Sequence, residues 1–84
     1  MNANEVIKKA QQEFVRIGKK PADGVAGLSK TDEGWSVLLE GIERKAFSDT
    51  MDVLGLYELH LDHEGNLLSL DRKKLRNRGD TREN

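Results

Sequence analysis

The first 17 residues carry apolar side chains at every third or fourth position, with charged and polar side chains between them. This spacing predicts one amphipathic helix over residues 2–17. Gly18 can adopt the left-handed conformation that ends many helices, and Pro21 prevents the helix from continuing. Because a helix of about 15 residues is marginally stable alone, its apolar side must pack on another element. We expect Phe14 and Ile17 to anchor it there.

Further along the chain the apolar residues alternate with polar ones, a pattern typical of β-strands with one buried face. Two polar segments, Thr31–Gly34 and Asp62–Gly65, interrupt the alternation, and each has Gly in its fourth position. A glycine in the left-handed region suits the end of a four-residue hairpin loop. The pattern therefore predicts two β-hairpins with Lys30 opposite Trp35 in the first.

The same loops set the predicted register. Ala26 then lies opposite Leu39 in the first hairpin, and Leu59 lies opposite Leu68 in the second. This register brings the apolar residues of both hairpins to one face of the sheet, whereas a shift by one residue would scatter them. Under the helix we expect a core of Trp35, Val37, Leu39, Leu28, Tyr57, Leu59, Leu68 and Leu70.

Together these elements predict an α+β fold, in which one N-terminal helix packs on an antiparallel sheet of about four strands, made of two hairpins. We expect residues 1–74 to form a single α+β domain. Residues 75–84 contain Gly, Asn, Asp and Thr among repelling positive charges, so we expect a flexible basic C-terminal tail.

The sheet face opposite the helix has mixed character in this prediction, because aliphatic side chains alternate there with Glu40 and Glu58. One interpretation is a solvated face with scattered leucines, which monomers tolerate. The other is a surface that binds a partner. Phe47, in the long segment 45–52, either folds back on the core or contributes to such a contact. The candidate partner-binding residues are Leu38, Ile42, Leu54, Leu56, Phe47, Arg72, Arg76 and Arg78.

Composition narrows the class of protein. The 84 residues include no Cys, so disulfides and thiolate metal sites are excluded, and a cytoplasmic protein is expected. No apolar run approaches the length of about 18 residues that a membrane-spanning helix needs. Residues 1–70 carry 8 basic and 12 acidic side chains, whereas residues 71–84 carry 6 basic and 3 acidic ones. The chain therefore combines an acidic segment, residues 1–70, with a basic C-terminal segment, residues 71–84, and the function should account for this asymmetry.

Catalytic and metal-binding patterns are weak in this chain. His60, Asp62, His63 and Glu64 gather near one hairpin loop, but no Cys or third His completes a tetrahedral set, so we expect a solvated turn and no metal. The sequence has neither a phosphate-binding loop nor a nucleophile elbow. Glu40 and Glu58 share one face, and cross-strand ion pairs with Arg44 or Arg72 are expected for them rather than a catalytic pair of carboxylates. We predict a protein that is not an enzyme and has no cofactor.

An ordered series of residues in the hairpin region resembles the gas vesicle protein GvpO family. The likeness covers about residues 25–78 and is carried by Gly34-Trp35, Glu40, Glu43, Arg44, Asp52-Val53-Leu54, Tyr57-Glu58-Leu59, Leu61-Asp62, Gly65, Leu67 and the basic end from Arg72. The resemblance implies a non-enzymatic accessory protein of gas vesicle formation. It would act in the cytoplasm beside the shell protein and other accessory proteins, including an ATPase-like one.

Two function classes stay open from the residues themselves. The first is an interaction module for assembly, which binds through the open sheet face, the Phe47 segment or an edge strand. The second is a small nucleic-acid-binding or regulatory protein that uses the basic C-terminal tail. Against the second, four aromatic residues provide no stacking platform, and the acidic body would repel phosphates.

Overall fold

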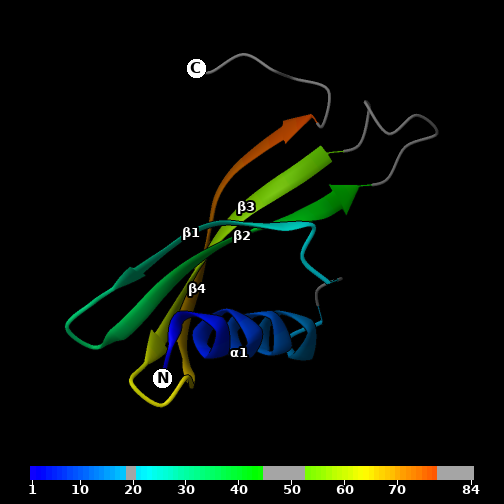
Figure 1. The fold of residues 1–84 in the computed structure, drawn as a ribbon. Coiled ribbons are helices and arrows are strands. Elements are labelled where there is room, and N and C mark those ends of the chain that lie inside the picture. The colour runs from blue at the N-terminus through cyan, green and yellow to red at the C-terminus, as the bar shows by residue number, and fades with distance from the viewer. Residues whose placement is uncertain (19–20, 45–52, 78–84) are drawn as a thin grey trace.

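The computed structural model describes residues 1–18, 21–44 and 53–77, the side chains of residues 43, 44, 76 and 77 excepted. In these residues one helix packs on a four-stranded antiparallel sheet with the strand order β1-β2-β3-β4 (Figure 1). The elements are α1 (Ala3–Arg16), β1 (Gly24–Lys30), β2 (Gly34–Arg44), β3 (Val53–Asp62) and β4 (Leu67–Asn77). The predicted α+β architecture of one helix on two hairpins is therefore confirmed.

Helix α1 begins at a complete capping box. The Asn2 side chain accepts a hydrogen bond from the Glu5 amide at 2.9 Å, and the Glu5 carboxylate accepts one from the Asn2 amide at 2.9 Å. Gly18 follows the helix with φ of +96°, as the sequence predicts. Ile17 was expected to anchor the helix, but this was wrong, because Ile17 caps the C-terminus and is 39% exposed.

The core lies between α1 and one face of the sheet. Phe14 is 2% exposed, and its ring meets the Tyr57 ring edge to face, with the centroids 5.2 Å apart. The ring also lies over Gly41, where an added Cβ would be 3.3 Å from Phe14 Cε2. A side chain at position 41 would therefore require the Phe14 ring to shift by a few tenths of an ångström. The buried cluster consists of Val6, Ala10, Phe14, Val37, Leu39, Tyr57, Leu59 and Leu61, with Ala22, Leu28, Trp35, Leu67 and Leu70 packed against it.

The first hairpin has the predicted loop and most of the predicted register. Lys30 lies opposite Trp35 and Leu28 opposite Val37. The predicted pairing of Ala26 with Leu39 is wrong, because a β-bulge places Val25 opposite Leu39. Trp35 is only half-buried, with Lys30 Nζ 5.5 Å from the centre of its ring.

The second hairpin departs further from the prediction. Its turn extends to Asn66, whose carbonyl accepts the Asp62 amide at 2.9 Å, and Leu67 then lies opposite Leu61. The next shift in register makes Leu68 the extra residue of a bulge, and Leu68 is 50% exposed. The expected place of Leu68 in the core is therefore wrong. Leu70 reaches the core opposite Leu59.

Strand β4 continues to Asn77 and so includes residues 75–77, which were predicted to belong to the tail. A second bulge interrupts its pairing with β3 between Leu56 and Tyr57. Residues 78–84 lie outside the described ranges. In the part of the chain that is described, no helix is long and apolar enough to cross a membrane.

Candidate functional site

The candidate site is the open face, which we define as the sheet face opposite α1. On β2 and β3 the residues that alternate with the buried core point to this face. Cross-strand partners there are Ser36 with His60, Leu38 with Glu58, Glu40 with Leu56, and Ile42 with Leu54. The open face thus combines a polar cluster near the hairpin turns with an aliphatic region towards the other end of the two strands.

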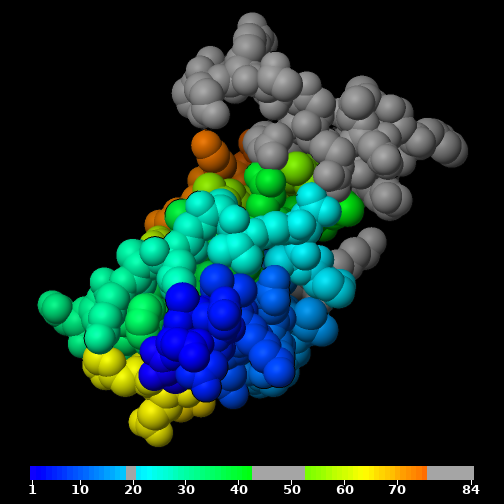
Figure 2. Space-filling model, in the orientation of Figure 1, coloured from blue at the N-terminus to red at the C-terminus, as the bar shows by residue number. Residues whose placement is uncertain are grey.

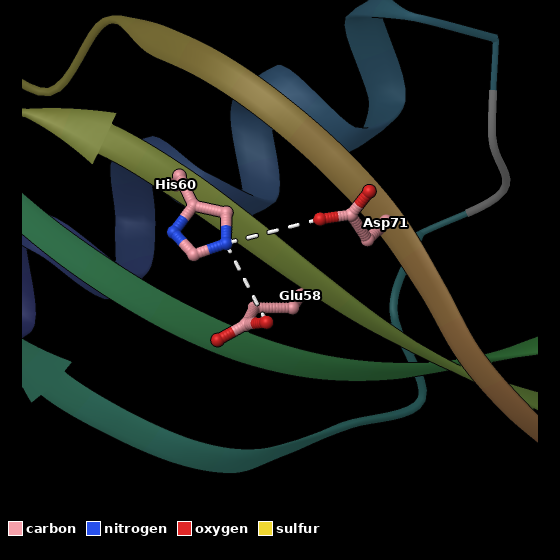
Figure 3. A group of neighbouring side chains, drawn as sticks. All are labelled: Glu58, His60 and Asp71. Carbon is pink, nitrogen blue, oxygen red and sulfur yellow. Dashed lines mark ion pairs between the residues drawn. The ribbon is translucent and has the colours of Figure 1, made fainter.

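Glu58 is the centre of the polar cluster. Its carboxylate accepts a hydrogen bond from Ser36 Oγ at 2.7 Å and lies 3.1 Å from Lys73 Nζ. His60 Nε2 is 3.4 Å from the same carboxylate and 3.9 Å from Asp71 on β4 (Figure 3). With Ser36 on β2, the cluster spans three strands. The hydrogen bond from Ser36, followed by the bond and charge of Lys73, lowers the pKa of Glu58. The carboxylate therefore stays ionised well below neutral pH.

This cluster also contains the one group of three potential metal ligands found among the described residues. Ligand atoms of Glu58, His60 and Asp71 lie within 4.8 Å of one another. However, the Lys73 ammonium and the Ser36 hydroxyl already bond to Glu58. A cation would have to displace that ammonium, so the geometry is that of a satisfied cross-strand ion-pair network.

Most of this network is not predicted from the sequence. Arg72, one expected partner of Glu58, lies opposite Tyr57 instead, and the ion pair found among the described side chains is with Lys73. The side chain of Arg44, the other expected partner, lies outside them. Lys73 reaches Glu58 because the second bulge of β4 adds a residue there. A prediction that assumes strict alternation of inward and outward side chains does not include that extra residue.

The aliphatic residues of the open face differ in exposure. Leu38, Ile42 and Leu56 are half-buried, and they form a zigzag across β2 and β3 because Leu56 is diagonal to both of the others. Leu54 was expected to share this surface, but its side chain is 1% exposed. It lies on an inner strand, with Ile42 and Arg76 as its cross-strand partners.

The polar residues of the hairpin turns form hydrogen bonds within and between the turns. Asp62 accepts the amides of Glu64 and Asn66 at 2.9 and 2.8 Å, and these bonds, that of Asn66 foremost, lower the pKa of Asp62. His63 Nε2 lies 3.2 Å from the carbonyl oxygen of Asp32 and so links the two turns. His60 is turned instead towards Glu58 on the open face.

The remaining candidate residues are placed only in part. Arg72 is exposed on β4, and Arg76 is a residue of the same strand. Phe47 and Arg78 lie outside the described residues. The structure therefore brings together Leu38, Ile42 and Leu56 on the open face.

These features define a class of small α+β protein, in which a single helix backs one face of a four-stranded meander and the other face mixes ion pairs with aliphatic side chains. A sequence profile described as "Gas vesicle synthesis protein GvpO" matches residues 1–82. The chain therefore belongs to the GvpO family.

Individual relatives agree with this assignment. The chain is 32% identical over 82 residues to gas vesicle protein O1 of Halobacterium salinarum, a match that covers 98% of the chain and 66% of the relative. It is 30% identical over 74 residues to gas vesicle protein O of a Streptomyces species, covering 88% of the chain and 58% of the relative. The chain thus spans less than two thirds of the length of these relatives. No solved structure matches it significantly.

Proposed function

We propose that this chain is a non-enzymatic accessory protein of gas vesicle formation, which acts in the cytoplasm through contacts with other gas vesicle proteins. The observation that carries the proposal is the family match over residues 1–82, together with relatives named gas vesicle protein O. Charged residues make up 35% of the chain. This composition is more typical of an accessory protein than of a shell subunit, which packs against its copies through apolar surfaces.

The open face is the surface that we propose for these contacts. Three half-buried aliphatic residues, Leu38, Ile42 and Leu56, lie there beside the Glu58 ion pairs. Anchoring side chains next to charged groups are typical of contacts between proteins that also exist apart. Leu54 lies on the same face as the cross-strand partner of Ile42, but it is buried, so we leave it out of the proposed contact.

Gene replacement in a vesicle-forming host tests the proposal. Deletion of the gene should abolish vesicles, and the wild-type chain should restore them. Leu56→Asp should fail to restore them, because it places a charge without a partner at the centre of the contact. His63→Ala, which changes the exposed turn, is the matched control and should restore vesicles. Circular dichroism and thermal unfolding of the purified variants establish that each one folds.

The two parts of the proposal fail separately. Vesicles that persist after the deletion would overturn the role in vesicle formation. If the deletion abolishes vesicles but folded Leu56→Asp restores them, the open face is ordinary surface and the contact lies elsewhere on the chain.

A further inference from the structure

Strand β4 is an edge strand with an unusual charge. It pairs with β3 on one side, and in the described part of the chain no strand pairs with its other side. Within Leu67–Asn77 there are four basic residues and one acidic residue, and that acidic residue, Asp71, lies beside His60. An edge of this kind offers a row of backbone donors and acceptors within a positive field.

The cations flank the edge on both faces of the sheet. Arg72 shares the α1 side with its partner Tyr57, whereas Lys74 shares the open face with its partner Leu56. Both are exposed, and neither forms an ion pair within the described residues, in contrast to Lys73, which Glu58 holds. Next to them, Leu75 is 48% exposed. The C-terminal half of β4 therefore presents two available cations and one apolar side chain along an unpaired edge.

We propose that this edge of β4 accepts an extended acidic segment of another protein as an added strand. Main-chain hydrogen bonds would supply affinity, and the cations on the two faces would select acidic side chains. A second copy of β4 fits poorly, because antiparallel pairing would set Arg72 and Lys74 against like charges. The edge of β1 is a weaker candidate, since it is 7 residues long against 11 for β4 and contains one basic residue, Lys30.

Basic side chains on an edge also serve simply to prevent aggregation. The two explanations differ in one observable, which is whether the edge binds an acidic strand. This inference concerns a surface distinct from the open face, and it rests on the proposed function only in assuming that the chain works by protein contact. A binding assay tests it without any vesicle measurement, so either proposal can fail alone.

The probe is a fluorescein-labelled peptide of alternating Glu and Val, titrated with the full chain and followed by fluorescence anisotropy. We expect saturable binding that weakens about tenfold with Lys74→Glu. Lys8→Glu makes the same change of charge on the exposed side of α1 and should alter the affinity by less than about twofold. A second peptide with the same side chains but N-methylated at every residue should bind about tenfold more weakly, because neither of its edges can donate hydrogen bonds to the ladder.

Several results would overturn the proposal. Absence of binding by the folded full chain means that the basic edge is only protective or is closed by the chain itself. Equal binding of the N-methylated peptide means that charge alone attracts the probe. Tighter binding of single-stranded RNA of similar charge means that the basic strand is a nucleic-acid site. Equal weakening by Lys74→Glu and Lys8→Glu places the peptide elsewhere.

Discussion

Phe14 provides the most direct test of how α1 is held on the sheet. It is the one aromatic residue of the helix and is 2% exposed. Its ring meets Tyr57 edge to face at an interplanar angle of 63° and lies against Gly41. The substitution Phe14→Ala removes the ring from all of these contacts at once. Gly41, opposite Gly55, leaves no side chain that could refill the space on that part of the sheet.

The expected cost is large for a chain of this size. Truncation of a buried Phe to Ala costs about 3–5 kcal/mol, because the transfer free energy is lost and a cavity remains. The edge-to-face pair with Tyr57 contributes about 0.5–1.5 kcal/mol of that cost. At the usual stability per residue, an 84-residue domain has about 4–13 kcal/mol in total. Phe14→Ala therefore removes a large part of the free energy of unfolding.

Urea unfolding followed by circular dichroism measures this loss. Val15→Ala is the matched control, because Val15 is the next residue of α1 and is 46% exposed, so its truncation should cost less than about 0.5 kcal/mol. If Phe14→Ala costs no more than Val15→Ala while the helical signal persists, then α1 is not held by the Phe14 contact and the packing described above is wrong.

Two further predictions concern Trp35 and Glu58. Because Trp35 is half-buried, Trp35→Ala should lower the free energy of unfolding in urea by about 1–2 kcal/mol, less than Phe14→Ala does. The fluorescence maximum of the native protein should lie between those of a buried and a solvent-exposed Trp. A loss greater than that of Phe14→Ala would refute the partial burial of Trp35. Because Ser36 and Lys73 lower the pKa of Glu58, the ionised carboxylate stabilises the fold at neutral pH. This stabilisation is lost as the pH falls from the ordinary pKa of a glutamate towards the lowered pKa of Glu58. Glu58→Gln should therefore flatten the decline of the free energy of unfolding between about pH 6 and about pH 3, and an unchanged slope would contradict the network.

The order and type of the elements could be predicted from the sequence because residues within or next to each element mark it. Helical spacing with Asn2 and Gly18 at its ends marks α1, and two loops that end in Gly mark the hairpins. These features are set by residues close together in the sequence, so periodicity detects them. The first hairpin keeps its predicted register from Leu28 to the turn for the same reason.

The register of the second hairpin could not be predicted by counting. The Asp62 carboxylate accepts the Asn66 amide within the turn, and one bulge then moves Leu68 out of the core. A bulge inserts one residue and shifts the alternation by one position beyond it, so a count that assumes strict alternation assigns the later residues to the wrong partners. The contact of Lys73 with Glu58 depends on such a bulge, and the polar cluster of the open face was missed for this reason.

The open face was predicted in outline but not in the exposure of each residue. Alternation correctly assigned Leu38, Ile42 and Leu56 to the face opposite α1, and it assigned Leu54 there as well. Alternation tells which face a residue occupies, whereas burial also depends on the neighbouring strands. Leu54 is buried although it lies on the open face and is not part of the core cluster under α1.

Site-specific photo-crosslinking in vesicle-forming cells tests the central claim most directly. A photoreactive residue replaces Leu56 on the open face in one strain and Gln12, which is exposed on α1, in another. If the open face contacts another gas vesicle protein, position 56 should crosslink to such a protein and position 12 should not. Crosslinks from position 12 alone, with both variants folded and supporting vesicles, would contradict the claim.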